Sequence, residues 1–441
     1  MLARLLAPTL VALAAVAPAA SASDRAALQS TDLVSRAFDG GMPDGASVNP
    51  AISQDRRFAR LIAFESDATN LVAGDTNGQR DVFVVQRDGS LGNNGSPWSV
   101  GSTTLLSRGA DGQPADGASY GAAVDGSWAG TRGGQETSRP SCVAFVSAAT
   151  NLVPGDTDGV ADAFVSHGPG GSLEKVSQGG GGVTQVAVSG DCSRIAYVEG
   201  GRVRVKAGNR VADLGPGQDP SFAVGQTDDL VFGSSAGVKL SVNGTGRART
   251  VAPGGSNPSY NDVKCRVVAY EKDGQVAFRK LGGDPNCAIG DGEHVASQNG
   301  GAPGNGRSRN PVVGNSGFYV TFTTDATNLG VNALGRAGDD NGTPDVYLYT
   351  DARRITLAQS VAEKGVPAGG DNGTMSYYAN YVVFDSPAPI GAGDGPRQIY
   401  LRYLGPSSPR GLDCRPRCGP FACAASPSWA PVRSRCTSCA T

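Results

Sequence analysis

Short apolar strands alternate with Gly- and Asp-rich turns along most of this sequence, and no long helix-period pattern interrupts them. Three segments share almost the same letters and end in Ala-Thr-Asn-Leu, at residues 63–71, 144–152 and 321–329. A Gly and Asp loop and a second apolar strand follow each of them, at residues 81–84, 162–165 and 345–348. Alternation of this kind between tight turns predicts antiparallel β-sheet built from an internal repeat.

Four shorter relatives of this strand fill the gaps, at residues 195–198, 230–232, 268–270 and 382–386. Together they give seven units at spacings that suit a four-stranded propeller blade. Within a unit we expect an inner strand such as 50–53, the Ala-Phe strand, the Val-Phe strand and an outer strand such as 103–107. The pattern therefore predicts an all-β propeller with seven four-stranded blades, with six or eight as the neighbouring counts.

One strand near the N-terminus belongs to no unit. Residues 31–36 resemble the outer strands at 105–108 and 175–177, whereas the last unit stops after residues 398–403 without an outer strand. We expect the N-terminal strand to complete the last blade, which closes the ring and removes free sheet edges. An open β-sandwich or two separate β-domains would explain the strands but not this orphan strand.

The Ala-Thr-Asn-Leu strand end, the Asp-Val-Phe strand and the Val-Ser outer strand resemble the WD40-like or TolB-like (PD40-type) propeller repeats of secreted bacterial proteins. The resemblance covers residues 31–404. It implies a propeller scaffold of a kind that often serves protein interaction or associates with the cell envelope. The family is functionally diverse, so a resemblance of fold assigns no activity.

The two ends of the chain differ from its body. Residues 1–22 contain an N-terminal Arg, an apolar run and a small-x-small triplet, which predicts a cleaved signal peptide. The alternative is a membrane anchor, but a spanning helix needs about 20 apolar residues and this run is shorter. We expect a secreted or envelope-associated propeller at residues 23–404, with no membrane span after cleavage, and a Cys-, Pro- and Arg-rich tail at 405–441 that is disordered or disulfide-linked.

Charge and cysteine content narrow the partners and the compartment. The 38 Lys and Arg residues nearly balance the 40 Asp and Glu residues, so no basic stripe points to nucleic acid. The nine cysteines fit an oxidising compartment. In the body we favour a bridge between Cys265 and Cys287, then one between Cys142 and Cys192, although sequence alone does not determine connectivity.

The loop between the two middle strands of each long unit carries metal-like chemistry. Oxygen-bearing side chains stand at its first, third and seventh positions around a Gly, which suits a hard cation such as Ca²⁺. The same residue types also form hydrogen-bonded turns without any ion, so both interpretations remain open. The candidate ligands are Asp75, Asn77, Asp81, Asp156, Asp158, Asp162, Asp339, Asn341 and Asp345.

A binding or protein-interaction module is the function that these features favour. Long loops on a rigid scaffold often carry recognition, so we expect a monomer with a protein or glycan ligand at its loop face, where Trp98 would either stack on a ligand or cover a blade end. The alternative is a glycosidase or lyase at the channel mouth. We identify no catalytic residue. His167 and His294 share no motif, and the acidic residues that break the repeat form no recognisable pair, namely Glu136, Glu199, Glu271 and Glu293.

Overall fold

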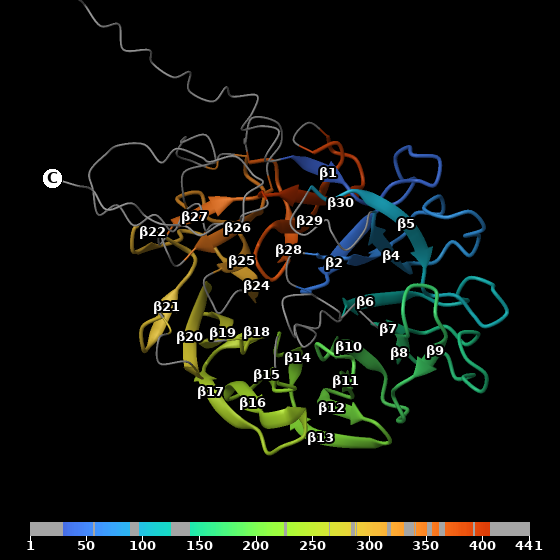
Figure 1. Ribbon diagram of the computed structural model, residues 1–441, viewed down its shortest axis with the longest axis horizontal. Helices are drawn as coiled ribbons and strands as arrows, with labels where there is room; N and C mark the ends of the chain where they lie inside the picture. The colour runs from blue at the N-terminus through green and yellow to red at the C-terminus, as the bar shows by residue number, and fades with distance from the viewer. Residues whose placement is uncertain are drawn as a thin grey trace, which may run out of the picture.

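Seven four-stranded antiparallel sheets surround a central axis in the computed structural model, as the blades of a propeller (Figure 1). The all-β, seven-bladed fold expected from the repeat is thereby confirmed. The structure describes residues 30–55, 58–88, 97–124, 142–224, 227–263, 265–283, 287, 289–314, 319–329, 339, 341–350, 355–360, 367–390 and 393–405. The expected leader and the tail beyond Gly405 lie outside these residues.

Each blade runs from an innermost strand at the axis to an outermost strand at the rim. Blade 1 consists of β2 (Ser47–Ile52), β3 (Leu61–Ser66), β4 (Asp81–Arg87) and β5 (Val100–Leu105). Blade 2 consists of β6 (Ser119–Val124), β7 (Val143–Ser147), β8 (Asp162–Ser166) and β9 (Leu173–Lys175). Blade 3 consists of β10 (Val183–Val188), β11 (Arg194–Glu199), β12 (Arg202–Ala207) and β13 (Arg210–Pro216). Blade 4 consists of β14 (Gln218–Phe222), β15 (Leu230–Ser234), β16 (Gly237–Ser241) and β17 (Arg249–Pro253).

The remaining blades follow the same order. Blade 5 consists of β18 (Ser256–Asn261), β19 (Cys265–Lys272), β20 (Gln275–Gly283) and β21 (Glu293–Val295). Blade 6 consists of β24 (Ser308–Gly314), β25 (Tyr319–Thr324), β26 (Asp345–Thr350) and β27 (Ile355–Ala358). Blade 7 consists of β28 (Asp371–Met375), β29 (Tyr381–Pro387), β30 (Arg397–Tyr403) and β1 (Thr31–Leu33). A short hairpin of β22 (Gln298–Asn299) and β23 (Ala302–Pro303) lies between blades 5 and 6 in the chain.

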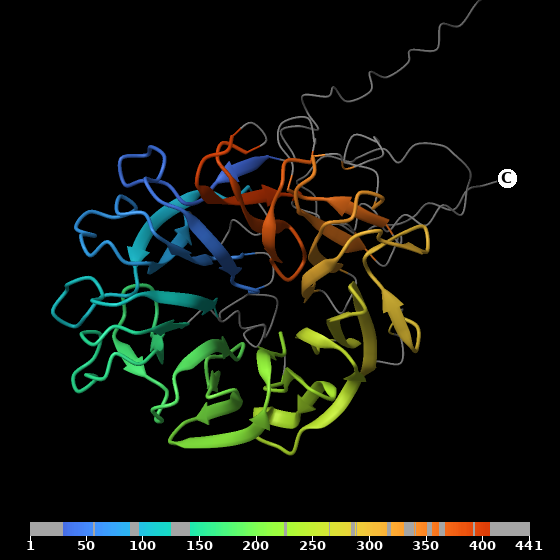
Figure 2. The same ribbon diagram turned by 180° about the vertical axis from the view of Figure 1, so that it is seen from behind.

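The N-terminal strand closes the ring, as the orphan strand predicted. β1 pairs antiparallel with β30, with Thr31 opposite Arg402 and Leu33 opposite Tyr400. Figure 2 shows the blue N-terminal strand beside the red C-terminal strands. This pairing covers the edge that β30 would otherwise expose, and it joins the two ends of the described chain in one sheet.

The core consists of seven hydrophobic clusters among the described residues, one between each pair of neighbouring blades. The middle strands are buried on both faces, so alternate residues enter different clusters. In β3, for example, Ile62 and Phe64 pack toward blade 7, whereas Leu61 and Ala63 pack toward blade 2. Continuous apolar strands are therefore required even though the sheets are antiparallel.

The Thr-Asn pair at the end of the repeat fastens the loop that enters the same blade. The Thr69 N–H and hydroxyl both donate to the Asp44 carboxylate, at 2.8 and 2.7 Å, and Asn70 Nδ2 donates to the Met42 carbonyl. A Cβ on Gly45 would lie 2.5 Å from the Asp67 carbonyl, which explains the glycine there. Equivalent contacts occur at Thr150 and Asn151 and at Thr327 and Asn328. The motif is thus explained by structure rather than by ligand binding.

Two disulfides join the four cysteines of the described chain, Cys142 with Cys192 and Cys265 with Cys287. These are the two pairings that the sequence favoured. The first connects blades 2 and 3, and the second lies within blade 5. In the part of the chain that the structure describes, we find no helix with the length and hydropathy needed to cross a bilayer.

Candidate functional site

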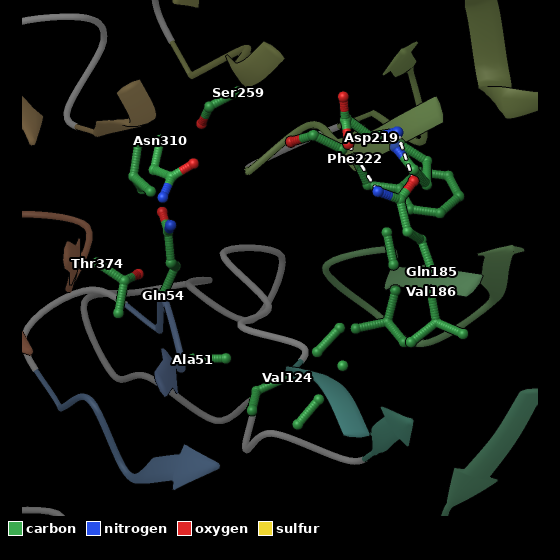
Figure 3. Close-up of a pocket in the computed structure, with 18 of the residues that line it drawn as sticks. Ala51, Gln54, Val124, Gln185, Val186, Asp219, Phe222, Ser259, Asn310 and Thr374 are labelled. Carbon is green, nitrogen blue, oxygen red and sulfur yellow. Dashed lines mark hydrogen bonds between the residues drawn. The ribbon is translucent and has the colours of Figure 1, made fainter. Parts of the chain in front are cut away.

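The axis of the propeller holds an open cavity of about 540 Å³ that is lined by the innermost strands of all seven blades (Figure 3). Its described lining contains small apolar residues, prolines, hydroxyl groups and six side-chain amides, which are Asn49, Gln54, Gln185, Asn257, Asn310 and Asn372. Asp219 is the single residue of this described lining that has an ionisable side chain. The described lining therefore offers hydrogen bonds to a ligand much more than charge.

A recurring bulge turns the innermost strands at the level of these amides. In β2, the pairing with β3 shifts between Val48 and Ala51, and Asn49 has a left-handed backbone with φ of 54°. Non-glycine residues seldom adopt this conformation, but Asn and Asp tolerate it better than most. Bulge residues with positive φ also occur in blades 2, 4, 5, 6 and 7, at Gly121, Asp219, Asn257, Asn310 and Asn372.

Side-chain amides of neighbouring blades are hydrogen-bonded to each other around the cavity. Asn257 Nδ2 donates to Asn310 Oδ1 at 3.0 Å, and Asn310 Nδ2 donates to Asn372 Oδ1 at 3.2 Å. Asn372 Nδ2 donates to Asp385 Oδ2 at 2.8 Å, and this oxygen also accepts the backbone N–H of Asn49 at 3.2 Å. We call this chain of contacts across blades 5, 6, 7 and 1 the amide belt.

On the opposite side of the cavity, a different pair of residues connects two neighbouring blades. Gln185 Nε2 donates to Asp219 Oδ1 at 2.7 Å, and the Asp219 N–H donates to Gln185 Oε1 at 2.7 Å (Figure 3). Burial raises the pKa of Asp219, and the hydrogen bond from Gln185 opposes this rise. Even the one carboxylate of the described lining is therefore held in place by an amide.

Buried carboxylates stand one strand behind the bulges and connect neighbouring blades. Glu65 Oε1 accepts the N–H of Gly121 in the next blade at 2.9 Å, and Glu271 Oε1 accepts the N–H of Asn310 at 3.0 Å. Asp385 does the same for Asn49, as described above. An arginine accompanies each carboxylate at this level, in the pairs Glu65 with Arg80, Glu199 with Arg204, Glu271 with Arg307 and Asp385 with Arg397.

The expectation that Glu199 and Glu271 break the repeat is wrong. Their register against β10 and β18 matches the register of Glu65 against β2, so they occupy the repeated level. Glu293 is hydrogen-bonded to the Tyr270 hydroxyl at 2.6 Å and paired with Lys272, and Glu136 lies outside the described residues. The repeat pattern did not predict the amide belt, although the Asn-Pro pairs that begin at residues 49, 257 and 310 are a signal that could have shown it.

Gln54 is a further polar group at the cavity. Its side chain points from the end of β2 into the pocket (Figure 3), and its Oε1 is buried without a hydrogen-bond partner in the described chain. A buried acceptor without a partner costs free energy of about 1–3 kcal/mol, which a donor on a ligand would recover. Gln54 is thus a candidate ligand-binding residue that the sequence did not indicate.

The nine predicted metal ligands lie in three equivalent loops, outside the cavity lining. The last aspartate of each loop begins the third strand of its blade, and its Oδ1 accepts a serine hydroxyl of the outer edge at 2.5 Å. These pairs are Asp81 with Ser107, Asp162 with Ser177 and Asp345 with Ser360. Each serine also accepts the N–H of the residue after its aspartate, which fixes the edge of the blade.

The second oxygen of these aspartates has different partners in different blades. Asp81 Oδ2 accepts Asn77 Nδ2 at 2.6 Å, and Asp345 Oδ2 accepts Asn341 Nδ2 at 2.7 Å. In blade 2 the middle residue is Asp158, which has no amide to donate. There the ammonium of Lys175 contacts Asp162 Oδ2 at 2.5 Å instead. The middle residues also cap their own turns, as the hydrogen-bonded-turn interpretation predicted.

The first and last aspartates of these loops are buried close to each other. Asp75, Asp156 and Asp339 are 6, 4 and 5% exposed. Burial raises the pKa of Asp81 to about 6 and that of Asp345 to about 8, and the charges of Asp75 and Asp339 add to these rises. The arrangement concentrates negative charge that a proton or a cation can neutralise.

The remaining candidates from the sequence do not form a common site. Trp98 is 7% exposed and donates from Nε1 to the Ala59 carbonyl at 2.7 Å, so it covers a blade end. His294 stacks on Phe278, and exposed His167 lies 3.4 Å from Glu174. Neither histidine belongs to the cavity lining.

No protein-family model matches the chain, and no curated protein matches it in sequence. It is similar in structure to an oligogalacturonate lyase in complex with manganese, with 10% identity, a TM-score of 0.48 and coverage of 85% of this chain and 96% of the lyase. It is also similar to TolB from Acinetobacter baumannii, with 12% identity, a TM-score of 0.35 and coverage of 56% of this chain and 60% of TolB. A third similar structure is the Pyrococcus horikoshii acylaminoacyl peptidase, with 10% identity, a TM-score of 0.46 and coverage of 83% of this chain and 53% of the peptidase.

These similarities say nothing of activity, substrate or partner, and the propeller fold of this chain rests on its own sheets. The TolB-like character of the repeat stays a prediction. Membership of the secreted PD40-type proteins stays a prediction.

Proposed function

We propose that this protein is an exported binding module that takes an uncharged polypeptide segment into the axial cavity. The observation that carries the proposal is the composition of the described lining, which has six side-chain amides and a single ionisable residue. Side-chain amides both donate and accept hydrogen bonds, as the peptide groups of a bound segment do. The two disulfides and the signal-like leader support export.

The lining favours a peptide over a glycan. Sugar-binding sites commonly stack a ring on an exposed aromatic face. Phe222 is the one aromatic residue in the described lining, and it is 5% exposed because it packs in the core between blades 3 and 4. Small apolar surfaces such as Ala51, Val124 and Val186 remain between the amides, and these suit the side chains of a peptide (Figure 3).

The lining also supports binding better than glycoside hydrolysis. Most glycosidases require two carboxyl groups that face each other across the scissile bond. The described lining contributes Asp219 alone, and the carboxylates behind it are engaged by arginines and backbone N–H groups. No observation on the described residues favours the carbohydrate-active alternative.

A peptide-display selection against the purified chain tests the proposal. Ala51→Trp would narrow the cavity, whereas Val242→Trp changes a side chain that is 52% exposed at a turn of blade 4 and serves as the matched control. We expect selected peptides to bind the wild type and Val242→Trp equally and to lose affinity for Ala51→Trp. Selection of no peptide, or of peptides that bind all three proteins equally, would contradict the proposal.

A further inference from the structure

The loop of blade 2 carries its own cation. Lys175, at the end of β9, places its ammonium 3.1 Å from Asp156 Oδ1 and 2.5 Å from Asp162 Oδ2. Both carboxylates are almost fully buried, at 4 and 2% exposed. The side chain therefore bridges the first and the last aspartate of the loop and supplies the counter-charge that buried carboxylates need.

The corresponding loops of blades 1 and 6 lack this lysine. Lys175 pairs with Phe164 in the sheet, and the same register places Leu105 opposite Phe83 and Ala358 opposite Tyr347. Neither Leu nor Ala can provide an ammonium. The first and last aspartates are nevertheless present and buried in both loops. Among the described residues, the first and last aspartates thus recur in all three loops, whereas a lysine stands at this position in blade 2 alone.

The loop of blade 1 contains a buried carboxylate oxygen that has no hydrogen-bond partner in the described chain. Asp75 is 6% exposed, and its Oδ1 is buried without a hydrogen bond in the described chain. In the same loop Asn77 Nδ2 donates to two other oxygens, namely Asp81 Oδ2 at 2.6 Å and the Ala115 carbonyl at 2.9 Å. A half-turn of the Asn77 amide would bring its oxygen to these two oxygens, and the Gln79 N–H, which Asn77 Oδ1 accepts at 2.9 Å, would then lose this acceptor.

We propose that the loops of blades 1 and 6 each bind one Ca²⁺-like divalent cation at the position that the Lys175 ammonium holds in blade 2. Asp75, Asn77 and Asp81 provide the side-chain ligands in blade 1, and Asp339, Asn341 and Asp345 provide them in blade 6. Backbone carbonyls and water complete the six to eight oxygens that Ca²⁺ requires. Two carboxylates in each loop balance the charge of the ion. The proposal rests on none of the cavity residues, so it stands or fails apart from the proposed function.

The loop of blade 2 is excluded from the proposal despite its composition. One oxygen from each of its three carboxylates, Asp156, Asp158 and Asp162, lies within 4.8 Å of the other two, and this is the one such group found among the described residues. The Lys175 ammonium already bridges two of them. Metal ions and this ammonium would compete for the same oxygens, so we assign the loop to the lysine.

The number of Ca²⁺ ions bound per chain tests the proposal. The purified full chain is stripped with chelator, equilibrated with millimolar Ca²⁺ and assayed by titration calorimetry and by elemental analysis. We expect two ions in the wild type, one in Asp75→Asn, one in Asp339→Asn and none in the double variant. Asp156→Asn is the matched control and should retain two ions. Circular dichroism reports whether each variant is folded.

A variant that is expected to gain a Ca²⁺ site provides a second test, which removes none of the proposed metal ligands. Lys175→Met frees the three carboxylates of blade 2, and we expect this variant to bind a third ion. Absence of Ca²⁺ binding in the wild type would overturn the proposal and leave the aspartates as turn residues that share a proton. Loss of binding in Asp156→Asn, or an unchanged number of ions in Lys175→Met, would overturn the assignment of the ammonium as the stand-in for the ion.

Discussion

The Glu65 carboxylate of blade 1 accepts the backbone N–H of Gly121 in blade 2 at 2.9 Å, and the same oxygen accepts Asn49 Nδ2 at 3.0 Å. One side chain thus ties two blades together behind the cavity. Glu271 and Asp385 form the same link to Asn310 and Asn49. Because Glu65 is 3% exposed, water cannot easily replace it as the acceptor.

Removal of this acceptor should destabilise the propeller. Glu65→Leu leaves the Gly121 N–H and the Asn49 amide without their partner, and we expect a loss of about 1–3 kcal/mol in the free energy of unfolding. Glu65→Gln keeps an acceptor oxygen and should lose clearly less. Urea denaturation measures both variants. Equal stability of Glu65→Leu and the wild type would show that the link between blades does not stabilise the fold.

A methyl group at Gly45 should also destabilise the propeller. A Cβ there would lie 2.5 Å from the Asp67 carbonyl. Gly45→Ala therefore forces the loop that Thr69 holds away from Asp67, and we expect the free energy of unfolding to fall by about 1–3 kcal/mol. Gly180→Ala is the control, since nothing lies within 4 Å of its added Cβ. Thermal unfolding compares the two. A melting temperature of Gly45→Ala no lower than that of Gly180→Ala would contradict the close approach.

Asp55 should make stability depend on pH. Burial raises its pKa from 3.8 to about 6, although the Arg60 guanidinium, 2.7 Å away, opposes the rise. The folded chain therefore holds this proton at pH values where the unfolded chain releases it. As the pH rises from about 4 to about 6, the wild type should lose on the order of 2 kcal/mol relative to Asp55→Asn, and the difference should become constant by about pH 7.

Urea denaturation of both proteins at several pH values measures this difference. The Asp55→Asn variant cannot titrate at this position, so other ionisable groups cancel in the comparison. A constant difference between wild type and variant across this range would show that Asp55 does not hold a proton in the folded chain.

The repeat predicted the fold because its residues act within one blade or between neighbours. The strand at residues 31–36 had no unit of its own, and the last unit lacked an outer strand. The number of strands in each unit therefore predicted that the N-terminal strand completes the last blade and closes the ring. The Thr-Asn pairs recur at one place in each long unit because they fasten a nearby loop. Both body disulfides also follow from cysteines in the same or in adjacent units.

The site was harder to predict because its contacts cross the ring. Asn372 reaches Asp385 in its own blade, but the same carboxylate also binds Asn49, which lies 336 residues earlier in the chain. The sequence pattern did not predict the contact between Lys175 and Asp156, because Asp156 lies in the loop between β7 and β8, Lys175 ends β9, and the two meet only in the folded blade. Trp98 lies in a polar segment, yet it is buried because its ring covers the end of blade 1.

The salt dependence of peptide binding distinguishes recognition by the cavity amides from binding by charged residues. A peptide that binds the wild type but not Ala51→Trp is titrated at about 0.1 and about 1 M salt, between which the screening length falls from about 10 to about 3 Å. Recognition by the amides of the cavity predicts a Kd that changes less than about twofold, because neutral hydrogen bonds are little screened. A Kd that rises tenfold or more would contradict the claim and assign the binding to charged residues outside the described lining.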